Sequence, residues 1–472
     1  MKKASAGVSA YAGSRVLRNF ALQLGGEFGG QAVAFVIAIY LARVLDPHGF
    51  GVWVFASSVL LYCTVIIDGG TDVWGMREVA ARPQRLKRLT AAIFRSRLLL
   101  GIPAAAVVVA FLIVGSRDEH TALLLGLPIL LAFMFNTAWA HRGLETGLTG
   151  LAVLIQRLAM LLLVYALVTS TADARYVTLW QAIAESLGMV ILLLALLPRF
   201  KKAHRSSARI ATRYVFAHSW PLAAVKALRA LTATSAIVAL NFASTKVEVG
   251  YYGAALRIGT ILVLASTVFI NVAFPALSRA CRRADQATVI DASVRLLFTV
   301  IAPIAIGGII LSGPLIRDIM SPEFAKASTM LAILFGGHFA MAISDQLRRI
   351  LAARHMQKLD LKLTAISSIV SVTATVLLAS LYGGVGAAIA MVSGEVLLVA
   401  LSLWGVARTG SAVAILRDSA RPLAGAAVMG AAVLLTAGAP LLVRLAVGVG
   451  VYLCWAWLNR RQLQNDVKQI SA

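Results

Sequence analysis

Positively charged side chains stand inside apolar segments of this sequence, where an ionised group is costly. Lys226 and Arg229 are three residues apart near the middle of one apolar stretch, so in a helix they share a face. Arg157 and Arg257 lie inside two other apolar stretches. Arginine donates two parallel hydrogen bonds to a phosphate, and lysine adds a point charge. The four residues are therefore candidates to line a water-filled cationic chamber that binds a phosphorylated anion.

The alternative is that these cations form ion pairs that lock helices together, such as Arg157 with Glu185. Two adjacent like charges at one depth favour a binding role for Lys226 and Arg229. Arg157 and Arg257 fit either interpretation.

Acidic residues also occur inside the apolar stretches, and each is a candidate site for a coupling proton or sodium ion. They are Glu27, Glu185, Asp345 and Glu395. Glu27 lies between two glycine pairs, Gly25-Gly26 and Gly29-Gly30, which permit bending or close helix contact. A structural hydrogen-bonding role is the alternative for all four carboxylates.

Three other charged residues lie close to the ends of predicted helices, namely Asp68, Arg97 and Arg295. Side chains in such positions can extend toward the membrane surface. We therefore expect their charges to reach the interface.

Motifs of enzyme chemistry are missing from the chain. It has no GxxxxGK[ST] loop for ATP, no HExxH and no GxSxG. Its three cysteines, Cys63, Cys281 and Cys454, are too scattered for a zinc cluster or a disulfide framework. The sequence predicts a protein that is not an enzyme, with no catalytic residues, no bound metal and no cofactor.

The composition is that of an integral membrane protein. Of 472 residues, 60% are hydrophobic and 14% charged, whereas soluble domains carry about 25% charged residues. The net charge of +24 would suggest nucleic-acid binding in a soluble protein. Cytoplasmic loops of membrane proteins collect lysine and arginine, which explains this charge without nucleic acid.

Long continuous apolar runs predict an all-α polytopic protein, because the strands of a membrane barrel would alternate. A span needs about 20 apolar residues, and we predict about fourteen of them. They lie near 19–43, 49–69, 93–114, 121–140, 150–170, 177–197, 214–241, 250–274, 292–315, 327–347, 363–381, 384–407, 422–438 and 440–458.

The basic loops alternate with these spans so that the heavily charged ones fall on one side. They lie around 77–88, 199–213, 279–283 and 348–358. Positive loops face the cytoplasm. We therefore predict a multi-pass protein of the inner (cytoplasmic) membrane with both termini in the cytoplasm.

The spans divide into two halves. An N-terminal six-helix bundle (1–197) and a C-terminal six-helix bundle (214–407) flank a basic cytoplasmic linker (198–213). Two additional helices and a cytoplasmic tail follow (408–472). Because each half has an even number of spans, both halves start from the same side of the membrane. They should therefore be parallel repeats about an axis along the membrane normal, with the substrate site between them.

Two motifs of the first half resemble the bacterial polysaccharide-export flippases of the MOP superfamily. The first is Leu-Ala-Arg-x-Leu-Gly-Pro-x-x-Phe-Gly, which begins here at Leu41 and has Asp46 in place of its glycine. Asp68-Gly69-Gly70 and Arg77-Glu78 follow it as in the family. The second is Trp-x-x-x-Gly-Leu-Glu, which begins at Trp139. The resemblance covers the first 160 residues or so well, while the second half is similar mainly in the layout of its spans.

The resemblance implies a flippase that moves an undecaprenyl-diphosphate-linked oligosaccharide from the cytoplasmic to the outer leaflet by alternating access. The glycan would serve O-antigen, capsule or exopolysaccharide export, and glycosyltransferases and a polymerase would be partners. Proton or sodium would be the coupling ion.

Other functions remain open at this stage. A lipid II flippase of the same superfamily would share the cationic cavity. A multidrug antiporter would repel its cationic drugs from such a chamber. A membrane glycan polymerase or ligase would need a large outer loop, which the predicted spans do not leave.

Overall fold

The chain folds into helices joined by short loops. The computed structural model describes residues 2–202, 210–280, 286–354, 356–408 and 419–471, and within these ranges it contains no strand. Part of the predicted linker (203–209), residues 281–285 with Cys281, and residues 409–418 lie outside the described residues. The chain forms two units, Met1–Thr234 and Ser235–Ala472, which are described separately.

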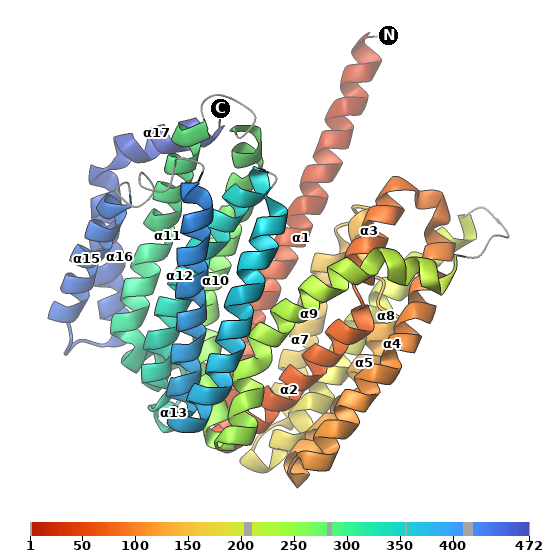
Figure 1. The fold of residues 1–472 in the computed structure, drawn as a ribbon, viewed down its shortest axis with the longest axis horizontal. Helices are drawn as coiled ribbons and strands as arrows, with labels where there is room; N and C mark the ends of the chain where they lie inside the picture. Colours follow the sequence, from red (N-terminus) through yellow and green to blue (C-terminus); the bar gives the residue numbers. More distant parts are fainter. Residues whose placement is uncertain (1, 203–209, 281–285, 355, 409–418, 472) are drawn as a thin grey trace. The chain divides into compact units, whose positions relative to one another are not determined.

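The first unit holds the long helices that precede Thr234 (Figure 1). They are α1 (Lys2–Val44), α2 (Pro47–Asp68), α4 (Leu86–Val114), α5 (Arg117–Met134), α7 (Leu148–Leu167), α8 (Val177–Lys202) and the first part of α9 (Thr212–Ala243). Within this unit α7 packs on α1 and α8, and α5 packs on α2 and α8. The short helices α3 (Thr71–Ala81) and α6 (Ala138–Gly143) pack against each other between the longer ones.

The second unit begins inside α9 and contains the remaining helices. They are α10 (Lys246–Ala280), α11 (Gln286–Pro314), α12 (Ala327–Ala353), α13 (Gln357–Ala407), α15 (Ala420–Leu435), α16 (Leu441–Leu458) and α17 (Arg460–Ser471). Here α12 packs on α10, α11 and α13, while α11 also contacts α15 and α17.

Twelve helices in the described residues are long and apolar enough to cross a membrane. One of them is α13, in which Gly383 has a non-helical backbone (φ 58°, ψ −140°), so two helices meet there. The sequence predicts a break at this point, between 381 and 384, and the structure confirms it. Fourteen spans result if α13 counts as two and the shorter α15 is added as one. That number stays a prediction.

Local sequence explains where α2 begins. Asp46 precedes the helix, and its Oδ1 accepts a hydrogen bond of 2.7 Å from the backbone N–H of Gly49. Pro47 occupies the first helical position, where its missing N–H costs nothing. Asp46, which departs from the family motif, therefore serves as the N-cap of α2.

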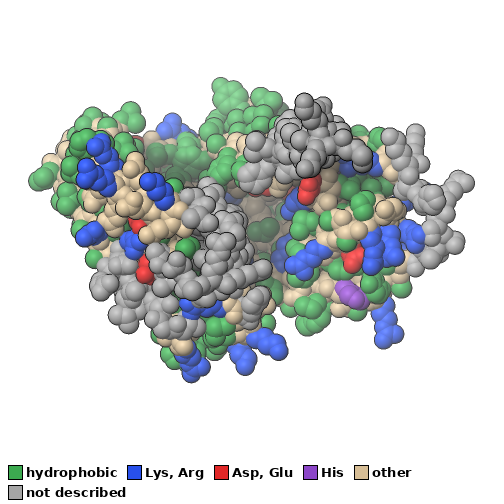
Figure 2. All heavy atoms as spheres, turned by 90° about the horizontal axis from the view of Figure 1, so that it is seen from above, with side chains coloured by type: hydrophobic (Ala, Val, Ile, Leu, Met, Phe, Trp, Pro, Cys, Tyr) green, Lys and Arg blue, Asp and Glu red, His purple; other side chains and the backbone are tan. Residues whose placement is uncertain are grey.

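Figure 2 looks onto one face, on which the blue Lys and Arg side chains outnumber the red Asp and Glu ones in each unit. Such a distribution is typical of a cytoplasmic face. The orientation, the domain boundaries and the repeat between the halves stay predictions.

The glycine cluster of α1 makes close helix contact, as predicted. A methyl group on Gly26 would overlap the backbone carbonyl of Gly150 in α7, and one on Gly30 would come within 2.8 Å of Val153. Gly25, by contrast, has open space around it. The packing of α1 on α7 thus depends on particular glycines of the cluster.

We expect Gly26→Ala to destabilise the protein by about 1–3 kcal/mol, because the added methyl must push α1 away from α7. Thermal unfolding in detergent measures this effect. The neighbouring Gly25→Ala is the matched control, and its melting temperature should equal that of the wild type. Equal melting temperatures for both variants would show that α1 does not need this contact.

Candidate functional site

One buried carboxylate is shared by two cations in the first unit. Asp68, the last residue of α2, is fully buried. Its Oδ1 lies 3.2 Å from Nη2 of Arg97 on α4, and its Oδ2 lies 2.7 Å from Nζ of Lys226 on α9. Asp68, Arg97 and Lys226, called the Asp68 cluster below, join three helices through one acidic group.

Two glycines bring the end of α2 against α9. Gly69 and Gly70 both have left-handed backbones, with φ of 52° and 74°, which turn the chain from α2 into α3. A Cβ on Gly70 would overlap the carbonyl oxygen of Ser219 and would lie 2.6 Å from the backbone nitrogen of Ala223. Lys226 follows Ser219 by about two helical turns. The Asp68-Gly69-Gly70 motif therefore places its carboxylate within reach of Lys226.

The prediction that Asp68 and Arg97 reach the interface is wrong. Arg97 is 1% exposed and Asp68 0%. Besides Asp68, the guanidinium donates hydrogen bonds to Thr71 Oγ1 at 3.0 Å and to the carbonyl oxygen of Asn136 at 2.7 Å. Because every side of the guanidinium finds an acceptor, the charge can remain inside the protein.

Arg295 was also expected at the interface, and this stays a prediction, because its partner lies on an amphipathic helix that is not a span. Its Nη2 lies 2.7 Å from Oδ1 of Asp466 on α17, and the two side chains are 16% and 4% exposed. The amphipathic α17 follows the last apolar span and is not itself a span, so the ion pair could not be foreseen from apolar runs.

The Asp68 cluster carries more positive than negative charge. One carboxylate faces two cations, and each nitrogen of the buried Arg97 has an acceptor. The nearby Asp72 also attracts Arg97 but is paired with Arg142, so the balance stays positive. The Lys226 side chain is 40% exposed, and its ammonium donates one hydrogen bond in the described part of the structure, to Asp68. An ammonium has three donors. The excess charge is therefore presented at Lys226, and the exposed Arg229 lies one turn further along α9.

Arg157 has the partner that the alternative interpretation named. Its Nη1 lies 3.9 Å from Oε1 of Glu185 on α8, with side chains 30% and 17% exposed. Glu185 also accepts a hydrogen bond of 3.1 Å from Gln181, whose own Oε1 accepts one of 3.0 Å from Trp53 on α2. Arg157 and Glu185 thus belong to a polar network between α2, α7 and α8.

The remaining candidates are spread over both units. Arg257 is half-buried in α10, and Glu395 Oε2 accepts a hydrogen bond of 3.0 Å from Ser344. Asp345 lies 3.3 Å from Arg348, which also pairs with Asp360.

Glu27 differs from the other acidic candidates because it is exposed on α1. Its Oε1 is 3.5 Å from Nε2 of Gln23, one turn away on the same helix. Among the described residues, no three His, Cys, Asp or Glu side chains are grouped as a metal site would require.

The chain matches the sequence profile of a family described as polysaccharide biosynthesis protein over residues 16–281, which is more than half of its length. The chain belongs to this family. The match covers the first unit from residue 16 onward, with the Asp68 cluster, and extends to the end of α10.

Relatives of this polysaccharide biosynthesis protein support the same placement. It is 21% identical to a putative O-antigen transporter of Escherichia coli K12 over 374 residues, covering 77% of this chain and 90% of the relative. It is 28% identical over 149 residues to the probable low-salt glycan biosynthesis flippase Agl15 of Haloferax volcanii, covering 31% of this chain and 32% of the relative.

Two solved structures share the fold of this family member. A lipid II flippase, MurJ, in an inward closed conformation aligns with a TM-score of 0.76 at 13% identity, over 94% of this chain and 99% of that one. An inward-facing multidrug resistance MATE transporter of the MOP superfamily aligns with a TM-score of 0.62 at 15% identity, over 83% and 96% of the two chains. The protein is thus a polytopic helical membrane protein with the MOP transporter fold.

We expect Asp68→Asn to destabilise this polysaccharide biosynthesis protein by about 3–5 kcal/mol, because Arg97 would keep its buried charge without a counterion. Thermal unfolding in detergent measures the loss. Arg82→Ala is the control, since Arg82 is 55% exposed and lies 3.9 Å from Glu78; it should cost under about 1 kcal/mol. If the two variants melt alike, the Asp68 cluster does not hold the helices together.

Proposed function

We propose that this protein is a flippase for an undecaprenyl-diphosphate-linked oligosaccharide. It would carry the lipid from the cytoplasmic to the outer leaflet of the inner membrane by alternating access, for export of O-antigen, capsule or exopolysaccharide. Membership of the polysaccharide biosynthesis family and the named roles of the O-antigen transporter and of Agl15 support this proposal. Both termini would be cytoplasmic, and glycosyltransferases and a glycan polymerase would act before and after it.

The observation that carries the proposal is the positive excess of the Asp68 cluster. Asp68 lies 2.7 Å from the Lys226 ammonium and also pairs with Arg97. Its single negative charge cannot neutralise both cations. The diphosphate of a carrier lipid supplies the missing negative charge and accepts the remaining ammonium hydrogen bonds. Arg229, on the same face of α9, adds a guanidinium that can bind two phosphate oxygens together.

Arg157 and Arg257 have secondary places in this proposal. Arg157 is held by Glu185 and would meet phosphate only by exchanging that partner. Arg257 is a half-buried cation of the second unit. Both would stabilise the diphosphate at a later stage of transport, after it leaves α9.

A lipid II flippase is the second candidate, favoured by the extent of the fold likeness to MurJ. Its substrate also carries a diphosphate, so the Asp68 cluster does not separate the two functions. The family match and the O-antigen transporter favour the oligosaccharide. A multidrug antiporter fits less well, because the exposed cations of α9 repel cationic drugs.

We expect the double variant Lys226→Gln/Arg229→Gln to lower translocation of a lipid-linked oligosaccharide in proteoliposomes at least about tenfold, because charge-assisted bonds to phosphate are lost. Arg175→Gln is the matched control, since this exposed arginine stacks on Tyr176 far from the cluster in sequence, and it should transport normally. Lipid II is offered in parallel as a second substrate.

Wild-type transport by the double variant would contradict the cationic binding site. Transport of lipid II with exclusion of the oligosaccharide would replace the proposed substrate by the second candidate.

We propose Glu27 as the first residue to test for ion coupling, by H⁺ or Na⁺. Its carboxylate is exposed and accepts one long hydrogen bond from its own helix. By contrast, Glu185 and Glu395 have partners on neighbouring helices, and Asp345 pairs with the cation Arg348.

We expect Glu27→Gln to remove the dependence of transport on the ion gradient, since the amide binds neither a proton nor a sodium ion. The measurement compares translocation in proteoliposomes with and without each gradient. The adjacent Gln23→Ala is the control and should keep the dependence. A gradient effect that survives in Glu27→Gln would exclude this carboxylate as the coupling site.

A further inference from the structure

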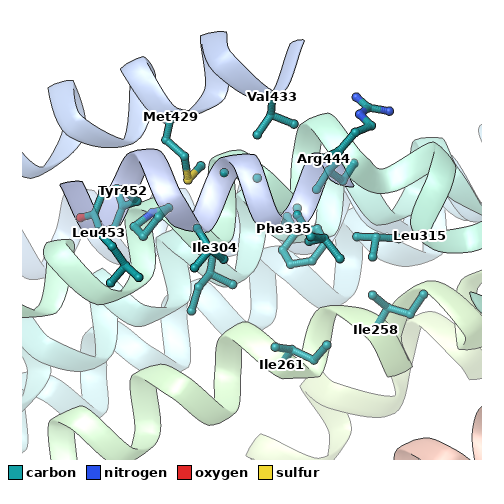
Figure 3. Close-up of a pocket in the computed structure, with 17 residues that line it drawn as sticks. Ile258, Ile261, Ile304, Leu315, Phe335, Met429, Val433, Arg444, Tyr452 and Leu453 are labelled. Atoms are coloured by element: carbon teal, nitrogen blue, oxygen red, sulfur yellow. The ribbon is translucent and has the colours of Figure 1, made fainter. Parts of the chain in front are cut away.

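The second unit contains an apolar cavity of about 350 Å³ between α10, α11, α12, α15 and α16 (Figure 3). Its lining includes Ile258, Ile304, Phe335 and Met429, and among the lining residues only Arg444 is charged. The cavity lies within one unit and shares no residue with the Asp68 cluster. It is therefore a separate feature of the protein.

Missing side chains create part of this space. Gly307 and Gly308 of α11 and Gly448 of α16 line the cavity. A methyl group on Gly307 would meet only Met429 Cε, at an ordinary contact distance of 3.5 Å. The cavity thus has room beside Gly307 that a larger side chain would fill.

Arg444 is buried, and no carboxylate of the described residues forms an ion pair with it. It is 7% exposed, and its Nε is buried with no hydrogen-bond acceptor among the described residues. It differs in this from the buried Arg97 and the partly buried Arg295, which each face a carboxylate. A buried charge without a partner is strongly unfavourable, so the site calls for an anion.

The position of Arg444 indicates where that anion would lie. Arg444 is one turn into α16, just after the turn at Pro440, so it is near a membrane boundary rather than mid-bilayer. The positive end of the α16 dipole adds to its attraction for an anion. In Figure 3 Arg444 stands at the opposite end of the cavity from Tyr452 and Leu453. The charge thus lies at one end of the cavity, and the apolar lining extends from it along α16.

The dimensions fit one hydrocarbon chain. Nine residues separate Arg444 from Leu453, which corresponds to roughly 14 Å along the helix. If a methylene group takes about as much space as a water molecule, ~30 Å³, the cavity holds on the order of a dozen of them. The adjoining face of α16 is apolar and exposed, with Leu442 at 79% and Leu453 at 62%, so lipid can reach it. A polyprenyl carrier tail is several times larger than this space.

We propose that this cavity binds one acyl chain of a glycerophospholipid whose phosphate pairs with Arg444. The lipid fills the space between α11 and the last two spans, and its phosphate balances the buried guanidinium. A free phosphate gains nothing from the apolar lining, and a neutral lipid leaves Arg444 without an anion. The site is independent of the proposed transport function.

Native mass spectrometry of the purified protein with added phosphatidylglycerol tests the proposal. We expect the wild type to hold one lipid and Arg444→Gln to bind it at least about tenfold more weakly, through the loss of a charge-assisted bond. Gly307→Leu should weaken binding with Arg444 intact, because it fills the cavity. Arg421→Gln is the control, since this exposed arginine of α15 pairs with Gln462, and it should bind as the wild type does.

Three further probes identify the occupant. Diacylglycerol and inorganic phosphate should each bind far more weakly than phosphatidylglycerol, and undecaprenyl phosphate should not displace it. Equal binding by wild type, Arg444→Gln and Gly307→Leu would overturn the proposal. Displacement by undecaprenyl phosphate that depends on Arg444 would also overturn it, by assigning the cavity to the carrier lipid. If Arg444→Gln does not remain monodisperse, Arg444→Lys, which keeps the charge, replaces it as the variant at this position.

Discussion

The central constraint on this protein is that a charge within a membrane must meet an opposite charge or water. Asp68 satisfies it by holding Arg97 on one oxygen and Lys226 on the other. Arg97 is buried with an acceptor for each nitrogen, so it fixes α2 and α4 together. Lys226 donates one hydrogen bond to Asp68, and the proposed function assigns its other donors to a phosphate. One carboxylate thus supports the helices and leaves positive charge on α9, which is the property that a carrier of phosphorylated lipids needs.

Much of the fold could be predicted from the sequence, because a membrane span requires a long apolar run. The break of α13 near Gly383 was foreseen in this way, and the glycine cluster of α1 predicted close helix contact without naming the partner helix. The helices α3, α6 and α17 were not, since they are short or amphipathic and do not cross the membrane. The length of an apolar run gives no information about such helices. One of them, α17, nevertheless carries Asp466, which forms the ion pair with Arg295.

The candidate site was predictable in part: Lys226 and the pair of Arg157 with Glu185 were singled out, but the pairing of Asp68 with Arg97 and Lys226 was not. Lys226 and Arg229 stand out because their neighbours are apolar, and Arg157 with Glu185 was named as a pair before it was seen. Asp68 and Arg97 were misplaced because distance from a helix end does not reveal depth within the protein. The pairing follows from the left-handed Gly69 and Gly70, which press the end of α2 against α9. A pattern of two glycines after an acidic residue is the signal that could have indicated it.

The central claim, that uncompensated positive charge beside Asp68 recognises phosphate, is tested most directly by equilibrium binding. The purified protein is titrated with undecaprenyl diphosphate, undecaprenyl monophosphate and undecaprenol, which share one tail and differ in charge. The account predicts that affinity falls at each removal of a phosphate, and that added salt weakens the two anions and not the alcohol. Equal affinity for all three lipids would contradict it.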